Sequence, residues 1–472
     1  MKILGKNTRK CFISLTVSLL LSFHVYPGGT RAFALSLEDE SILGQRFLMQ
    51  VSRAFEFVDD DFANEYINAL GHYLISPLEI KHFPYRFYII KENDLNAFAG
   101  PGGHIFFLSG LIEAMDDVDQ LASVVCHEIG HISARHLAKR IEQSKKLNLA
   151  TLAGILAGIL VGGQAATAIM LGSQAAAAQA QLSYSRSDER QADQLGFKYM
   201  DASGFDPSEM ITAFRKLEAG QYLGGDKIPA YLLTHPGGPE RMSNVETMLT
   251  EYTPKPVNKE VVDFRRLYPF FKTVVRAESL DPQDAVRLFN KELEKDPNST
   301  LAHFGLGIVW KEKSEYARAI DHFLKALKGQ PESPPILRGL GEAYQLNGQD
   351  AEAIEVLEEA LKIDDVDKSA LFLLAVTYQG LEQYPKAIRF YQRLTLMRPV
   401  RNEVFYNLGM SYGREGGLAL AHYNFGIYFR RLGRVKKAQY HFQKAEELSK
   451  GDPALRSRIQ KAMERLQKKP VR

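Results

Sequence analysis

The chain has 472 residues, which is too long for one small hydrophobic core, so two or three domains are expected. Its 45% apolar and 24% charged residues are typical of a globular protein. The first 34 residues hold five basic residues and no acidic one, which leaves 54 basic against 56 acidic residues in the remainder. That balance argues against a nucleic acid as partner.

Residues 1–34 are predicted to be a signal peptide. A basic start precedes the apolar run CFISLTVSLLLSF, which is too short to span a membrane comfortably. The residues Pro27-Gly28-Gly29 end this run, and Ala32-Phe33-Ala34 matches a signal-peptidase site, so cleavage is expected after Ala34. The alternative is an uncleaved membrane anchor. Cleavage would leave Cys126 as the one cysteine, and it is predicted to be a core thiol rather than a metal ligand.

Residues 35–250 are predicted to form one domain in which helices surround a small sheet. Apolar spacing predicts helices between about residues 40 and 80. The stretch RFYIIKENDLNAFAGPGGHIFFLSG, residues 86–110, predicts short strands separated by turns. A long helix is predicted from near Asp117 to about Lys145, with further helices up to about residue 250.

Residues 147–185 contain no charged side chain. Small residues at Gly154, Gly158 and Gly162 follow a spacing that allows close helix packing, as in a membrane hairpin. The second half is rich in Ala and Gln and only weakly apolar. The preferred interpretation is therefore a helical pair that packs on the protein or makes peripheral contact with a membrane surface.

Residues 251–265 are predicted to be a linker, and residues 266–465 an α-solenoid of tetratricopeptide repeats. The repeat register extends backward by half a repeat and restarts 17 residues late, so a helix near residues 417–431 is predicted to end one repeat and open the next. The alternative, an unrelated helical bundle, does not explain four registers with a period of 34. The four registers are Gly307, Gly341, Ala375 and Gly409; Trp310, Tyr344, Tyr378 and Tyr412; Ala319, Ala353, Ala387 and Ala421; and Phe323, Leu357, Tyr391 and Phe425.

The segment HEIGH, residues 127–131, carries the chemistry. On a helix the imidazoles of His127 and His131 project from one face, as two ligands of a tetrahedral zinc ion require. Glu128 lies beside them, where it can take a proton from a water on the metal. Gly130 costs the helix about 1 kcal/mol relative to alanine, which indicates that another element approaches closely. The alternative is an ordinary amphipathic helix, because the bare motif also occurs by chance.

A catalytic zinc ion needs a third protein ligand. His136 is expected to be a surface or core histidine, because it follows His131 too closely on the same helix to reach the metal. Glu189 and Asp193 share one helix face, where Glu189 can bind zinc and Asp193 can accept a hydrogen bond from the far ring nitrogen of a ligand histidine. The alternative is a solvated charged face.

These segments together resemble the metallopeptidases of the HtpX and CAAX-prenyl-protease group. The matching segments are HEIGH with SARH, YSRSDERQAD, NAFAGPGGHIFFLSGLI and THPGGPERM. The resemblance implies a mainly α chain with an α+β domain of minigluzincin type, and Glu189 as third ligand of one zinc ion. It places His235 near the zinc on a mobile loop, as fourth ligand or as stabiliser of the tetrahedral intermediate. Gln191 stands where the family often has an acid.

The strand around Asn96, Ala97 and Phe98 is predicted to pair with an extended substrate, which favours unfolded chains. Exported members of the resembling group carry C-terminal tetratricopeptide repeats. The resemblance therefore predicts a periplasmic zinc endopeptidase that degrades unfolded or misassembled outer-membrane proteins, with repeats that contact the outer-membrane assembly machinery. The alternatives are a chaperone or scaffold with a dormant site, and a membrane-embedded protease anchored by residues 147–171.

Overall fold

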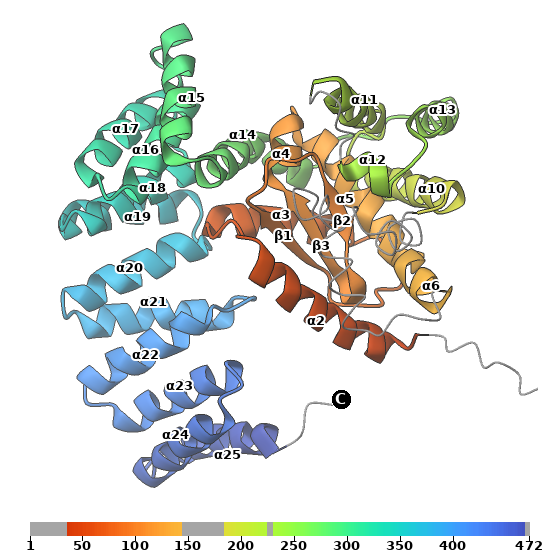
Figure 1. The fold of residues 1–472 in the computed structure, drawn as a ribbon. Helices are drawn as coiled ribbons and strands as arrows, with labels where there is room; N and C mark the ends of the chain where they lie inside the picture. Colours follow the sequence, from red (N-terminus) through yellow and green to blue (C-terminus); the bar gives the residue numbers. More distant parts are fainter. Residues whose placement is uncertain (1–34, 144–183, 224–229, 468–472) are drawn as a thin grey trace, which may run out of the picture.

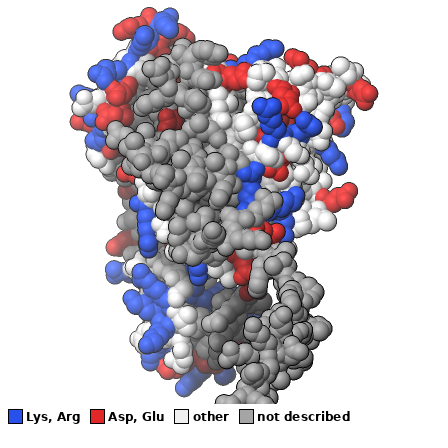
Figure 2. Space-filling view, turned by 45° about the vertical axis from the view of Figure 1, so that its right-hand side comes forward, with Lys and Arg blue, Asp and Glu red and all other residues white. Residues whose placement is uncertain are grey.

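The computed structural model describes residues 35–143, 184–223 and 230–467 (Figure 1). The predicted signal peptide and nearly all of the uncharged stretch lie outside the described residues. Among the helices that are described, none is long and apolar enough to cross a membrane. The described chain is mainly helical with one small sheet, which confirms the predicted fold class. Basic and acidic side chains are interspersed over the visible described surface (Figure 2).

The sheet joins β1 (Arg86–Ile90), β2 (Ala97–Ala99) and β3 (His104–Leu108) in the order β1-β3-β2. β1 runs parallel to β3 and β2 antiparallel to it, with Phe98 opposite Phe106. One face packs on α2 (Leu37–Ala54), where the Phe47 and Phe106 rings meet edge to face at 5.7 Å. The other face packs on α3 (Asp61–Leu74) and α5 (Val118–Ser133), so the sheet is covered on both sides.

The helix predicted from Asp117 to Lys145 is interrupted, which corrects that prediction. α5 starts behind the Asp117 cap but ends at Ser133, and α6 (His136–Gln143) follows as a separate helix. Arg135 between them has a φ of 54°, a left-handed conformation that ends the helix. Its guanidinium donates hydrogen bonds to the Glu40 carboxylate at 2.8 Å and to the Leu35 carbonyl oxygen at 2.6 Å. Contacts from α2 thus stabilise the break.

α10 (Arg186–Ser203) crosses α5 at the helix glycine of the HEIGH segment. A Cβ atom on Gly130 would lie 2.8 Å from the Ala192 carbonyl oxygen, closer than ordinary van der Waals contact. The expected close approach is therefore confirmed. The contact brings the acidic face of α10 against the histidine face of α5. The same domain continues with α4 (Ser109–Ala114), α11 (Glu209–Leu223), α12 (Ala230–Thr234) and α13 (Gly238–Leu249).

Replacement of Gly130 by alanine is expected to lower the melting temperature by about 2–8 °C. The added methyl group forces the α5 and α10 backbones apart at a cost of about 2–3 kcal/mol, of which helix propensity returns about 1 kcal/mol. Differential scanning calorimetry measures the shift. Gly380→Ala is the control, because nothing lies within 4 Å of a Cβ atom there. An equal response of both variants would contradict the packing argument.

The C-terminal part is a stack of antiparallel helix pairs (Figure 1). The stretch predicted as linker is non-helical only up to Asn258, whose side chain caps α14. The helices are α14 (Lys259–Ser279), α15 (Pro282–Lys295), α16 (Thr300–Glu312), α17 (Tyr316–Gly329), α18 (Pro334–Leu346), α19 (Asp350–Ile363), α20 (Lys368–Gly380), α21 (Tyr384–Leu396), α22 (Asn402–Arg414), α23 (Leu418–Arg431), α24 (Val435–Leu448) and α25 (Pro453–Gln467).

The period of 34 residues has a packing origin. A Cβ atom on Gly307 of α16 would lie 2.6 Å from the Phe323 ring of α17, so only glycine lets the two helices meet at this distance. Gly426 on α23 meets the Phe442 ring of α24 in the same way, at 2.4 Å. Because α23 also packs on α22, it ends one repeat and opens the next, as the shifted register predicts.

The repeats pack against the N-terminal domain through α14 and α3. The rings of Tyr66 on α3 and Phe271 on α14 stack with centroids 4.4 Å apart. Further along the stack, the Arg338 guanidinium lies 4.9 Å from the centre of the Phe62 ring, and Arg401 forms an ion pair with Asp61. Contacts at two separated points fix the direction of the stack relative to the domain.

Candidate active site

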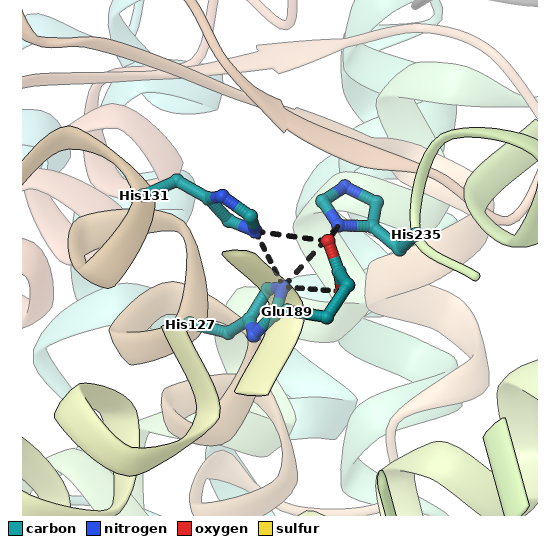
Figure 3. Close-up of side chains that lie close together, drawn as sticks. All are labelled: His127, His131, Glu189 and His235. Carbon is teal, nitrogen blue, oxygen red and sulfur yellow. Dashed lines mark hydrogen bonds and ion pairs between the residues drawn. The ribbon is translucent and has the colours of Figure 1, made fainter. Parts of the chain in front are cut away.

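Four buried side chains from three segments converge at one point (Figure 3). α5 supplies His127 and His131, α10 supplies Glu189, and the turn after α12 supplies His235. One potential ligand atom from each lies within 4.8 Å of the others. The Nε2 atoms of His127 and His131 are 2.9 Å apart, and the Glu189 carboxylate oxygens lie 3.4 Å and 3.3 Å from them, respectively. Imidazole nitrogens and a carboxylate are a donor set that fits zinc.

Glu128 lies beside these four side chains but is not one of the potential metal ligands. Both carboxylate oxygens are buried and have no hydrogen-bond partner among the described residues, and Oε1 lies 3.6 Å from His235 Nε2. Burial raises the pKa of Glu128, while His235 and His127 oppose that shift. A buried carboxylate that lacks partners is costly for the fold, and such groups are typical of active sites.

Asp193 and Arg241 orient the potential ligands His127 and Glu189 through contacts on the side away from the centre of the site. Asp193 Oδ1 lies 2.8 Å from His127 Nδ1, so the other ring nitrogen of His127 points to the centre. Arg241 on α13 donates two hydrogen bonds to the Asp193 carboxylate, at 2.9 Å and 2.8 Å, and its Nη1 is 3.1 Å from Glu189 Oε2. Arg241 is not among the site residues predicted from the sequence. Its position six residues after His235 in the THPGGPERM segment was the available signal.

His136 was expected to be a surface or core histidine, but it supports the site. It is buried at the start of α6, and its Nδ1 lies 3.0 Å from His131 Nδ1. Its Nε2 lies 2.9 Å from Gln191 Oε1, which accepts a hydrogen bond and so places the proton of His136 on Nε2. The Nδ1 atom of His136 is then an acceptor for the Nδ1–H of His131. This chain leaves His131 Nε2 without a proton and directed at the centre.

Replacement of His136 by phenylalanine is expected to weaken metal affinity by about 10–100-fold, the usual effect of removing such a support. The imidazole of His131 loses its acceptor and can rotate or change tautomer. Competition with a fluorescent zinc chelator measures the affinity. His82→Phe, outside the site, is the control for loss of a histidine. Unchanged affinity in His136→Phe would refute the tautomer argument.

The protonation states of His127, His131 and Glu189 depend on one another. Burial and the Arg241 cation lower the pKa of His127, but the hydrogen bonds to Asp193 and Glu189 outweigh them and raise it to about 9. Burial lowers the pKa of His131 well below its usual value. Burial raises the pKa of Glu189, but the charges of His235 and Arg241 overcome this effect and hold it well below its usual value. Glu189 is therefore a carboxylate, the form that binds metal.

The predicted substrate strand lies at the edge of the described sheet but is covered. Asn96, Ala97 and Phe98 are at most 1% exposed. The backbone N–H of Tyr231 on α12 donates a hydrogen bond to the Leu95 carbonyl oxygen at 3.4 Å, so the segment that precedes His235 lies against the start of this strand. Figure 1 shows α12 beside β2.

Cys126 does not take part in the group. It is fully buried in the core, and burial raises the pKa of its thiol, which confirms the prediction of a core thiol. A neutral thiol in this environment is a poor metal ligand.

Comparisons with known proteins agree with this architecture. The profile of peptidase family M48 matches residues 61–249, and tetratricopeptide repeat profiles match residues 275–334, 311–370 and 370–403. The beta-barrel assembly-enhancing protease of Yersinia pestis is 34% identical over 232 residues, 48% of each chain. That of Escherichia coli K12 is 32% identical over 230 residues, 48% of this chain and 47% of the relative.

Another relative, matched over a shorter stretch, is the mitochondrial metalloendopeptidase OMA1 of Arabidopsis thaliana, which is 34% identical over 155 residues, 32% of this chain and 29% of the relative. The chain spans about half the length of the two bacterial relatives that it matches. The resemblance drawn from the motifs is confirmed. The chain thus contains a peptidase family M48 domain, followed by tetratricopeptide repeats.

Proposed function

We propose that this protein is a zinc-dependent endopeptidase. The observation that carries the proposal is the convergence of His127, His131 and Glu189, with the carboxylate of Glu128 beside them. The M48 profile over residues 61–249 and the protease names of the bacterial relatives support the same activity. M48 metallopeptidases depend on a metal, and the donor set favours zinc.

In the proposed mechanism, His127, His131 and Glu189 would hold the metal, which would supply Lewis acidity toward a water and a peptide carbonyl. Glu128 accepts the proton of the attacking water, and burial, which raises its pKa, makes this carboxylate a stronger base. Glu128 then gives the proton to the nitrogen of the leaving peptide. Asp193 and Arg241 keep His127 and Glu189 in place during both transfers.

His235 is proposed to keep the enzyme latent. Its Nδ1 lies 3.0 Å from Glu189 Oε1 and 3.2 Å from His127 Nε2, where it takes up the position that a reacting water would need. The Tyr231 ring stacks on the imidazole at a centroid distance of 4.4 Å. Because Tyr231 also bonds the start of the predicted substrate strand, withdrawal of this segment would open the metal position and uncover the strand edge together.

Replacement of His235 by alanine is expected to raise cleavage of an unfolded substrate by about 10-fold or more, as a population shift of about 1.4 kcal/mol would produce. The variant leaves the fourth coordination position of the metal free for a water, while His127, His131 and Glu189 remain. Casein and an unfolded outer-membrane β-barrel protein serve as substrates, and peptide release is followed by mass spectrometry. The background control is His235→Ala with Glu128→Gln. If single His235→Ala leaves every rate unchanged, gating by this residue is excluded; a lower rate would instead assign it to transition-state stabilisation.

The proposed substrates are unfolded or misassembled outer-membrane proteins in the periplasm. The names of the bacterial relatives tie them to β-barrel assembly, and tetratricopeptide repeats commonly bind proteins. Residues 1–34 would direct export and be removed by cleavage after Ala34, and residues 147–185 would supply peripheral membrane contact. Substrate would pair with the strand that contains Ala97 and Phe98. The expected preference is for unfolded chains, and cleavage confined to one residue type regardless of folding would contradict it.

A chaperone or scaffold role is the second candidate. The enclosure of His235 and Glu128, which are 0% exposed, favours it, because a closed site leaves the repeats as the accessible functional surface. The two roles are compatible in one molecule.

A further inference from the structure

The residue that follows the expected cleavage position is bound by the peptidase domain. The backbone nitrogen of Leu35 donates a hydrogen bond to Glu142 Oε1 at 2.7 Å, and the Leu35 carbonyl oxygen accepts one from Arg135 Nη2 at 2.6 Å. Glu142 is on α6, more than one hundred residues further along the chain. Both backbone polar groups of Leu35 are therefore satisfied by charged side chains next to the HEIGH helix.

The carboxylate of Glu142 is not needed to cap α2. Ser36 accepts the hydrogen bond from Asp39 N, so the helix start does not need Glu142. A backbone N–H already forms a charge-assisted hydrogen bond with a carboxylate, worth about 1.5–3 kcal/mol. An ammonium group at the same place adds the attraction between two full charges to that hydrogen bond, so the arrangement suits a positive nitrogen better.

Hydrolysis of the Ala34–Leu35 bond would create that positive nitrogen. The reaction consumes one water, leaves a carboxylate on Ala34 and an amine on Leu35, and the amine takes a proton at neutral pH because its ordinary pKa is about 8. We propose that the Glu142 carboxylate is the binding site of the amino group released at Leu35 when the export signal is removed. This inference rests on the proposed export of the protein.

The surrounding charges favour a cation at this place. The first turn of α2 carries Glu38, Asp39 and Glu40, which offset the repulsion between an ammonium group and the positive end of the helix. Arg135 is one opposing cation, but its guanidinium is paired with the Glu40 carboxylate at 2.8 Å, and Lys139 on α6 is exposed to solvent. Glu142 thus contacts the nitrogen atom that would become the new amino group.

Arg135 and His136 connect the Leu35–Glu142 contact to the candidate active site. Arg135 holds the left-handed turn that separates α5 from α6, and His136 directly after it supports the ligand His131. Binding of the new terminus to Glu142 therefore fastens α2 to α6 at the support of the metal group. Removal of the export signal would stabilise this corner of the peptidase domain.

The test compares two forms of the chain that otherwise extend to residue 472. One begins at Leu35, released from a removable fusion partner, and the other begins with Gly-Ser before Leu35. Both keep a nitrogen at Leu35 that can donate to Glu142, so the difference isolates the charge. Each form is also made with Glu142→Gln. The readouts are the melting temperature and the pKa of the terminal amine, from pH-dependent reductive methylation and mass spectrometry.

The form that begins at Leu35 is expected to melt about 1–3 °C higher than the extended form, and this difference should vanish with Glu142→Gln. Its terminal amine should titrate above the usual value of about 8, and return to it with Glu142→Gln. Equal melting of both forms, together with an amine that titrates alike in both backgrounds, would overturn the inference. The zinc content of either form tests the proposed enzyme separately, and the N-terminus of the exported protein tests the cleavage position.

Discussion

Replacing Glu189 by alanine is expected to reduce the zinc content of the purified protein from about one ion per chain to a small fraction. A structural or catalytic zinc site uses three or four protein ligands, and Glu189 is the only anionic one in this group, so its loss weakens binding severely. In this site the carboxylate also balances the Arg241 cation, whose Nη1 lies 3.1 Å from Glu189 Oε2. Inductively coupled plasma mass spectrometry of protein purified without added metal, and again after zinc is supplied, measures the content.

Glu240→Ala is the matched control for this experiment. Glu240 stands on α13 near the site, and its exposed carboxylate pairs with Arg190 at 2.8 Å rather than with the metal group. It should keep its zinc. Full zinc in Glu189→Ala would remove Glu189 from the ligand set. If the wild-type protein takes up no zinc at all, the HEIGH segment is an ordinary helix and the function belongs to the repeats.

Replacing Glu128 by glutamine is expected to lower peptide cleavage by about 10²–10⁴-fold while zinc stays bound. Glutamine keeps the shape of the side chain but cannot accept the proton of the attacking water. Because Glu128 is fully buried and its burial raises its pKa, removal of the charge should not destabilise the fold. The rates are measured in the His235→Ala background, in which the gate is expected to be open, with zinc content measured on the same samples.

Glu128→Gln also separates the two proposed roles in cells. If the variant restores outer-membrane protein assembly in a strain that lacks the protein, the repeats act as a scaffold without proteolysis. If it fails while its zinc and its melting temperature are intact, proteolysis is required. A variant that cleaves at the wild-type rate would exclude Glu128 as the general base.

The sequence by itself determined the features that depend on short-range geometry. Two histidines four residues apart must share a helix face, so the direction of His127 and His131 follows from the helix period alone. The small residues of the repeats recur every 34 positions because each pair of helices meets at one crossing, as at Gly307. The cost of Gly130 within a helix likewise indicated that another backbone lies there. The residues alone allowed two interpretations of Glu189, as a zinc ligand or as part of a solvated charged face. The family resemblance favoured the zinc ligand.

Only the tertiary structure decided what depends on contacts between distant segments. The break between α5 and α6 exists because Glu40 and Leu35 of the N-terminal segment bind Arg135, and the local sequence predicts one continuous helix. The role of His136 follows from that break. Arg241 reaches the Asp193 carboxylate from a helix 48 residues away, and no periodicity connects the two residues. Local patterns report the conformational preferences of neighbours, whereas a buried charge network forms only when the packing of the whole domain removes water from it.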